Sequence, residues 1–164
     1  MSLALHTHAR ISGVEEVGLF KVLTLEEAVS DTYSAKTVLI WEAAESGYAG
    51  SIFAGEGGAD GVTISGARDP AVIQPGDVVR VRPGSSLVSV LYRRGSRANT
   101  LFATERCNSR CLMCSQPPRE AEDSWRVEEL LRLVELIDLD EAQLGISGGE
   151  PTLLGEDLGR LIDA

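Results

Sequence analysis

The sequence has few of the features that mark membrane, secreted or nucleic-acid-binding proteins. No apolar run approaches the roughly 18 residues that a membrane-spanning helix requires, and the start, MSLALHTHARIS, lacks the apolar core of a signal peptide. Basic residues are scarce, because 15 Lys and Arg face 25 Asp and Glu, a net charge of −10. Such a surface repels a nucleic-acid backbone. We therefore expect a cytoplasmic protein that binds neither nucleic acid nor membranes.

The sequence divides into two regions that differ in charge and in hydrophobic pattern. Residues 1–98 carry 9 basic and 11 acidic side chains, whereas residues 99–164 carry 6 basic and 14 acidic ones. In the first region, short apolar runs alternate with glycine- and proline-rich turns, a pattern typical of short strands. We expect strands over residues 17–22, 37–41, 48–53, 62–64, 78–81 and 87–92, and a short helix over 25–29 with Thr24 as its N-cap. Residues 1–98 are therefore predicted to form a small, barrel-like, β-rich accessory domain.

The second region has the alternating pattern of a parallel α/β fold. Apolar runs predict strands over residues 100–104 and 143–147. Between them, residues 125–138 carry apolar side chains at helical spacing, with Ser124 as the expected N-cap. A further helix is expected over residues 156–163. The order strand, helix, strand, helix predicts parallel strands.

All three cysteines of the chain lie within eight residues, at Cys107, Cys111 and Cys114, with the spacing C-x3-C-x2-C. Three cysteines so close together cannot all pair with one another or link distant loops by disulfides. Their spacing therefore indicates a metal site in a reducing compartment. Thiolates suit iron–sulfur clusters, zinc and Cu(I). The histidines His6 and His8 lie far upstream, so no fourth protein ligand is evident. Three thiolates with an open position are typical of a 4Fe-4S cluster that leaves one iron for a small molecule.

A second short element, Ser147-Gly148-Gly149-Glu150-Pro151, follows the last predicted strand. Its two glycines allow a backbone to approach a ligand closely. Parallel α/β folds bind ligands at the carboxyl ends of their strands. By itself, such a glycine turn is a common connection between a strand and a helix. Together with the cysteine loop, which also follows a strand, it predicts a ligand site.

With these two elements the chain resembles the radical S-adenosylmethionine (SAM) enzymes. The signature of that family is C-x3-C-x2-C after the first barrel strand and a GGEP-like motif after the second, and both are present between residues 99 and 164. The resemblance implies an α+β fold class. A β-rich N-terminal domain, 1–98, would be followed by the start, about two βα units, of a partial TIM-like (β/α) barrel, 99–164.

The resemblance also implies roles for individual residues. The three cysteines would ligate three irons of the 4Fe-4S cluster, and SAM would chelate the fourth iron. Gly148, Gly149 and Glu150 would line the methionine end of SAM, within a cofactor-binding turn that Ser147 begins and Pro151 shapes. An electron from the reduced cluster would cleave SAM to a 5′-deoxyadenosyl radical, which removes a hydrogen from the substrate.

The segment from Asn99 to Pro118 is similar to one subgroup, the His-Xaa-Ser system radical SAM maturases. These enzymes are thought to modify small ribosomally made peptides, and the similarity covers about residues 70–154. It implies a small peptide substrate, a reductant such as a flavodoxin or ferredoxin, and a second radical SAM maturase as a partner. We expect the arginines Arg106, Arg110 and Arg119 to be solvated or to offset the charge of the thiolates.

Two other functions stay open at this point. The cysteine loop would also suit a non-catalytic iron–sulfur or zinc module, and the chain would also suit an inactive fragment. Only 66 residues follow residue 98, enough for about two βα units of roughly 30 residues each. A complete (β/α)8 barrel needs about 250 residues. We therefore expect a truncated sequence whose barrel is incomplete.

Overall fold

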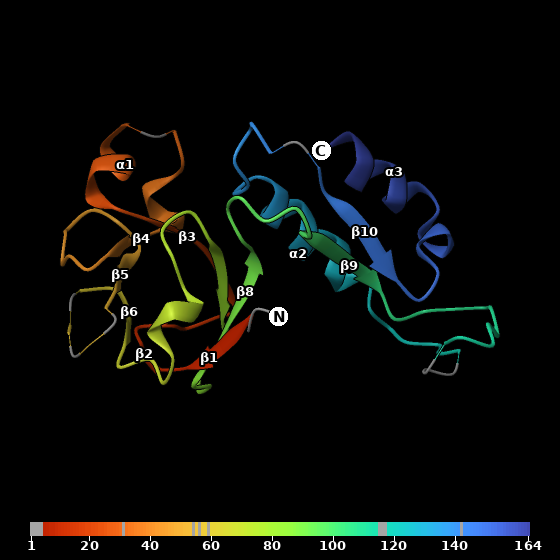
Figure 1. Cartoon of the computed structure of the whole chain (residues 1–164), viewed down its shortest axis with the longest axis horizontal. Coiled ribbons are helices and arrows are strands. Elements are labelled where there is room, and N and C mark those ends of the chain that lie inside the picture. The colour runs from red at the N-terminus through yellow and green to blue at the C-terminus, as the bar shows by residue number, and fades with distance from the viewer. Residues whose placement is uncertain are drawn as a thin grey trace. The chain divides into compact units, whose positions relative to one another are not determined.

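A computed structural model describes residues 5–30, 32–53, 55, 57–58, 60–114, 118–141 and 143–164. The chain forms two compact units, Met1–Gly95 and Ser96–Ala164 (Figure 1). Among the described residues, each unit has its own β-sheet, with eight strands in the first unit and two in the second.

The N-terminal unit is built on one mixed sheet of short strands. The strands are β1 (His6–His8), β2 (Arg10–Ser12), β3 (Gly18–Leu23), β4 (Val38–Trp41), β5 (Gly50–Ile52), β6 (Val62–Ser65), β7 (Val78–Val81) and β8 (Leu87–Tyr92). Their order across the sheet is β1-β8-β7-β3-β4-β5-β6-β2. The pairs from β3 to β6 are parallel, and the remaining pairs are antiparallel.

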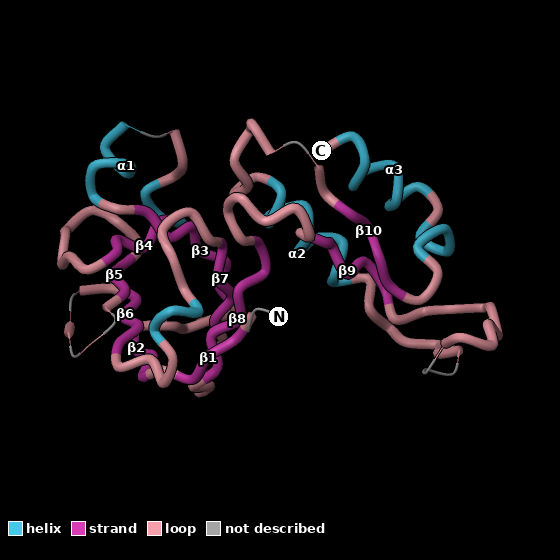
Figure 2. The backbone as a smooth tube through the Cα atoms, in the orientation of Figure 1, coloured by secondary structure: helices cyan, strands magenta, loops and turns pink. Residues whose placement is uncertain are grey.

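This sheet curls into a nearly closed barrel (Figure 2). β1 and β2 are the outermost strands of the order, yet Ala9 alone separates them in the sequence. A single residue spans only about 3.5 Å of extended chain, so the two edges of the sheet must lie close together. Ala9 is buried with the core.

Apolar side chains fill the barrel and cover one part of its outside. Because strand residues alternate between the two faces, neighbours on β3 and β4 belong to different clusters. The larger cluster includes Val22, Leu39, Ile64 and Val79, all fully buried. The smaller one, Leu23, Val38 and Ile40, is covered by Ala28 of helix α1 (Leu25–Ser30) and by Tyr33, Ala43 and Tyr48. Two short 3-10 helices, η1 (Ala35–Thr37) and η2 (Pro70–Val72), complete the unit.

Helix α1 begins as the sequence predicts. The Thr24 hydroxyl accepts a hydrogen bond from the Glu27 amide (3.3 Å), and the Glu27 carboxylate accepts one from the Thr24 amide (2.9 Å). This reciprocal pair satisfies backbone donors that a helix N-terminus otherwise leaves without partners. The prediction of Thr24 as the N-cap is therefore confirmed.

The described residues of the C-terminal unit form a parallel pair of strands and two α-helices. Its elements are β9 (Thr100–Thr104), α2 (Trp125–Val134), β10 (Gly145–Gly148), the 3-10 helix η3 (Pro151–Leu154) and α3 (Glu156–Asp163). β9 and β10 pair in parallel, with a shift in register between Ser147 and Gly148. Helix α2 buries Val127, Leu130 and Leu133, and Arg160 of α3 reaches Glu128 of α2 at 2.8 Å.

The expected fold class, a β-rich domain followed by the start of a TIM-like barrel, is wrong. The chain is mostly an eight-stranded, nearly closed, mixed-sheet barrel, and only 22% of it is helical. The physical reason is strand number, because a sheet closes only when enough tilted strands share it. That condition is met in the N-terminal unit. In the described part of the C-terminal unit, two strands form a small open sheet.

Two local predictions in this unit also need correction. Helix α2 ends at Val134, before the predicted end at residue 138, and its N-cap Ser124 makes no side-chain cap hydrogen bond. The Ser124 hydroxyl instead donates to the carboxylate of Glu122. Ser124 has helical backbone angles (φ −56°, ψ −29°) in place of the extended ones typical of an N-cap, so its hydroxyl oxygen does not accept from the amides of the first turn.

Candidate cofactor-binding site

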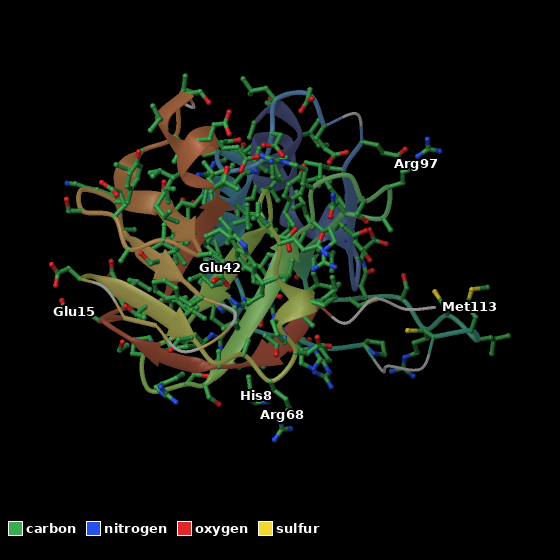
Figure 3. The ribbon with its side chains drawn as sticks, turned by 60° about the vertical axis from the view of Figure 1, so that its left-hand side comes forward. His8, Glu15, Glu42, Arg68, Arg97 and Met113 are labelled. Atoms are coloured by element: carbon green, nitrogen blue, oxygen red, sulfur yellow. The ribbon has the colours of Figure 1, made fainter. Side chains whose placement is uncertain are left out.

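The three cysteines lie on a long loop that follows β9. Cys107 is half-buried, Cys111 and Cys114 are exposed, and none of the three forms a disulfide. The loop runs away from the strand pair, and Met113 lies at its far end (Figure 3). Leu112 and Met113, two large apolar side chains, are almost fully exposed there. Pro117, within the segment from Asn99 to Pro118 that carries the subgroup resemblance, lies outside the described residues.

Strand β10 ends in the glycine turn at a point where the backbone has an unusual conformation. Gly148 has φ 148°, which side-chain-bearing residues rarely adopt. A Cβ built on Gly148 would lie 2.3 Å from the carbonyl oxygen of Thr104. The register shift at this position therefore requires glycine, both for its backbone angle and for its lack of a side chain.

Gly149 lies directly against the first cysteine of the loop. A Cβ built on Gly149 would lie 2.2 Å from the carbonyl oxygen of Arg106 and 2.9 Å from the Cβ atom of Cys107. No side chain fits at such distances. The fold thus brings the glycine turn and the start of the cysteine loop into van der Waals contact, although they are far apart in the sequence.

Backbone hydrogen bonds join the same two segments. The amide of Gly149 donates to the carbonyl oxygen of Thr104, and the amide of Glu150 donates to that of Arg106, both at 2.8 Å. These bonds extend the pairing of β9 and β10 beyond the ends of the strands. The turn is therefore held to the loop by its backbone, which leaves the side chains of both segments available for other contacts.

The side chain of Glu150 is used locally. It caps η3 by accepting hydrogen bonds from the Thr152 hydroxyl (2.7 Å) and the Thr152 amide (3.1 Å), and Pro151 occupies the first turn of that helix. The hydrogen bond from the Thr152 hydroxyl, followed by that from its amide, lowers the pKa of Glu150 below the ordinary value. Glu150 is thus kept as a carboxylate beside the glycine turn.

An open hollow of about 470 Å³ lies between the cysteine loop and η3. It is lined by Arg106, Cys107 and Asn108 at the start of the loop, by residues 119–122 where the chain returns, and by Leu153 of η3. Cavities of this size accept small molecules. Cys107, the half-buried cysteine, therefore lines a space large enough for a small ligand.

The three arginines of the loop have different surroundings. Arg106 and Arg110 are exposed, in agreement with the expectation of solvated side chains. Arg119 makes an exposed ion pair with Glu105 at 3.0 Å. Its guanidinium group thus has a carboxylate partner within the loop itself.

The residues fit a thiolate-bound group by their chemistry, although the three thiols are not assembled. In the described ranges, no three His, Cys, Asp or Glu side chains gather as a metal site. The amide of Cys114 donates to the carbonyl oxygen of Cys111 at 3.0 Å, which places these two residues in one tight turn. The three ligands are soft thiols. Cys111 and Cys114 share a turn, and Cys107 lies against Gly149. These features suit a metal–sulfur group.

Sequence reasoning missed the polar residues at the base of the loop. Asp123 is buried and accepts hydrogen bonds from the Thr104 hydroxyl (3.0 and 3.2 Å) and from the Glu105 amide. The available signal was an acidic residue within the run Glu120-Ala121-Glu122-Asp123, directly before the predicted helix. Nothing in that run distinguishes Asp123 from its neighbours until the fold buries it.

Comparisons of the chain with protein-family models, with curated proteins and with solved structures found no match. In the part of the chain that the structure describes, no helix has the length and apolar character needed to cross a membrane.

Proposed function

We propose that the C-terminal unit binds a 4Fe-4S cluster and SAM, and that the protein is a radical SAM enzyme. Cys107, Cys111 and Cys114 would hold the cluster, and the turn from Ser147 to Pro151 would receive SAM. When bound, this pair of cofactors supplies reductive cleavage of SAM, which starts radical chemistry on a substrate.

One observation supports this proposal more than any other, namely the contact between Gly149 and Cys107. The two motifs that carry the resemblance are separated in sequence, and a chance occurrence of each would not require them to touch. In the fold, a Cβ on Gly149 would lie 2.9 Å from that of Cys107. A ligand bound to a metal at the cysteines would therefore also meet the backbone of the glycine turn.

The chain's own residues have defined tasks in this proposal. The glycine turn presents backbone groups at short range, because no side chain covers them. Glu150 keeps its carboxylate in place through Thr152, and Leu153 supplies an apolar wall to the hollow. Arg106 and Asn108 add polar groups at the same opening. Together they would orient a charged small molecule and displace water from the thiol side of the hollow.

The substrate class is the finer part of the proposal. The similarity of residues 70–154 to peptide maturases supports a small ribosomally made peptide as the substrate, with a flavodoxin or ferredoxin as the electron donor. A direct test is to incubate the reconstituted protein with SAM, reductant and candidate peptides, and to search the peptides for loss of hydrogen by mass spectrometry.

The cluster is tested by anaerobic reconstitution with iron and sulfide. We expect about four irons per chain and a broad charge-transfer absorbance, as for a cluster with three cysteine ligands. Cys111→Ala should abolish both. Leu112→Ala is a matched control, because Leu112 is the exposed neighbour of Cys111 and carries no ligand atom. Preferential binding of zinc in place of iron would support a structural metal module and contradict the proposal.

SAM binding is tested on the reconstituted protein by electron paramagnetic resonance. Addition of SAM should change the spectrum of the reduced cluster, and reduction should release 5′-deoxyadenosine. Gly149→Ala should remove the spectral change, because the added methyl group cannot fit against Arg106. A cluster whose spectrum does not respond to SAM would identify a non-catalytic iron–sulfur module.

A further inference from the structure

The base of the cysteine loop is closed by a buried carboxylate. Asp123 is 4% exposed, and it lies where the chain returns from the loop to helix α2. Its oxygens accept hydrogen bonds from the hydroxyl of Thr104, the last residue of β9, and from the amide of Glu105. The residues on either side of the loop are therefore joined through one side chain.

A chain of hydrogen bonds leads from Asp123 to the glycine turn. The Thr104 hydroxyl donates to Asp123 and accepts from the amide of Arg106 at 3.0 Å. The carbonyl oxygen of Arg106 in turn accepts from the amide of Glu150 at 2.8 Å. Each link is a backbone group or a buried side chain, so displacement of the Asp123 carboxylate would loosen every later link.

Ion pairs reinforce the same base. Glu105 forms ion pairs with two arginines, Arg126 of α2 at 2.7 Å and Arg119 of the returning segment of the loop at 3.0 Å. The carbonyl oxygen of Arg119 accepts a hydrogen bond from the amide of Cys107 at 3.2 Å. Arg126 itself lies over the ring of Trp125, 4.7 Å from its centroid. Cys107 is thus held on both sides, by the glycine turn and by the returning chain.

The other two cysteines lie beyond this polar base and are exposed. The three thiols are therefore not equivalent before any ligand binds. One has a fixed backbone at the edge of the hollow, whereas the other two lie towards the exposed end of the loop.

We propose that Asp123 is a positioning residue that holds Cys107 against Gly149 at the edge of the hollow. A buried carboxylate costs free energy unless hydrogen bonds compensate it, and here those bonds are directed at the first residues of the cysteine loop. The consequence for cofactor binding rests on the proposed function. The consequence for Cys107 itself does not, because it concerns the metal-free chain.

The test is the alkylation rate of each cysteine in the metal-free, reduced full chain with iodoacetamide. Trypsin cleaves after Arg106, Arg110 and Arg119, so Cys107 is recovered in peptide 107–110 and the other two in peptide 111–119. In the wild type, Cys107 should react more slowly than the exposed pair. In Asp123→Ala, its rate should rise by about tenfold, the factor expected when a hydrogen bond to a charged group no longer opposes opening.

Asp123→Asn keeps one acceptor oxygen, so it should restore much of the slow rate of Cys107. This variant also carries the test if Asp123→Ala does not fold. Asp140→Ala is the matched control, because Asp140 is an exposed acid in the same unit and its removal changes the net charge equally. It should leave all three rates unchanged.

Two results would overturn the proposal. One is an unchanged Cys107 rate in a folded Asp123→Ala chain. The other is an equal rise at all three cysteines with a lowered melting temperature, which would mean general unfolding. Iron loading is measured separately on the same variants. If Asp123 controls the Cys107 rate but no variant, including the wild type, binds iron, the proposed function fails and the positioning role stands.

Discussion

Each of the two units of this protein contains a buried aspartate, and the two aspartates have different surroundings. In the N-terminal unit, Asp77 is 1% exposed and meets Arg93 at 3.1 Å. The Arg93 guanidinium also donates to the carbonyl oxygen of Val72 in η2. In the C-terminal unit, Asp123 is directed mainly at the backbone and hydroxyl of the segment that begins the cysteine loop. The first aspartate supports a core, and the second supports a loop.

The two units also differ in how many large apolar side chains they bury. The barrel contains fully buried side chains on β3, β4, β6 and β7. The smaller unit has Leu133 as a fully buried large side chain, but leaves Phe102 and Trp125 about half exposed. Hydrophobic burial is the dominant stabilising contribution in folding. We infer that the barrel owes its stability to its core, whereas the smaller unit depends more on polar contacts around its loop.

The largest expected effect is at Asp77. Asp77→Ala should lower the free energy of unfolding by about 3–5 kcal/mol, because it leaves the buried Arg93 without this carboxylate. Burial raises the pKa of Asp77 above its ordinary value, although Arg93 acts in the opposite direction. The cost of removing two charges from water offsets much of the attraction within a buried ion pair. The double variant Asp77→Leu/Arg93→Met should therefore recover most of the loss in urea unfolding. A double variant as unstable as Asp77→Ala would contradict this account.

The barrel core gives the next effect. Leu39→Ala removes a fully buried side chain of β4 and should lower the free energy of unfolding by about 2–5 kcal/mol. Val29→Ala is the control, because Val29 of α1 is 74% exposed and its truncation should change stability by less than about 0.5 kcal/mol. Both are measured by chemical denaturation monitored by circular dichroism. Equal losses in the two variants would mean that burial does not distinguish these sites.

The glycine turn should show a smaller loss of stability. Gly149→Ala forces a methyl group against the Arg106 carbonyl oxygen, and overpacking of this kind costs about 1–3 kcal/mol. Gly159→Ala is the control, because a Cβ at this α3 position meets no atom within 4 Å. It should raise stability by about 0.5–1 kcal/mol through helix propensity. A Gly149→Ala chain as stable as the wild type would show that the turn can move away from the loop.

The smallest expected effect on folding is at the exposed thiol. Cys111→Ala should change the free energy of unfolding of the metal-free chain by less than about 0.5 kcal/mol, since Cys111 is exposed and forms no disulfide. The same variant should lose iron binding. This combination separates a ligand from a structural residue, and a large loss of stability without metal would assign Cys111 to the core instead.

Several strands could be predicted from the sequence to the residue. The runs at 78–81, 87–92 and 100–104 form β7, β8 and β9 over the same positions, because alternating apolar residues between turns leave few alternatives. The strands β1 and β2 were missed, since His6–His8 and Arg10–Ser12 are short and polar. The parallel order of β3 to β6 was also beyond reach, because strand pairing depends on contacts between distant segments.

The two motifs of the candidate site could be predicted from the sequence, but the contacts that support them could not. The spacing of the cysteines and the glycines of residues 147–151 could be recognised directly. The Asp123–Thr104 contact could not, because neither residue differs in type from many exposed neighbours. Its importance comes from burial, which raises the cost of leaving a carboxylate without hydrogen bonds.

The sequence by itself determined the residue chemistry of this protein, namely three soft ligands on one loop, a glycine turn and a strongly acidic composition. These follow from residue type and spacing alone. Only the tertiary structure decided that strands β3 to β6 pair in parallel, that Gly149 touches Cys107, and that Asp123 closes the loop. The physical reason is that closure of a sheet, close packing and burial arise between segments far apart in the chain, so local pattern carries little information about them.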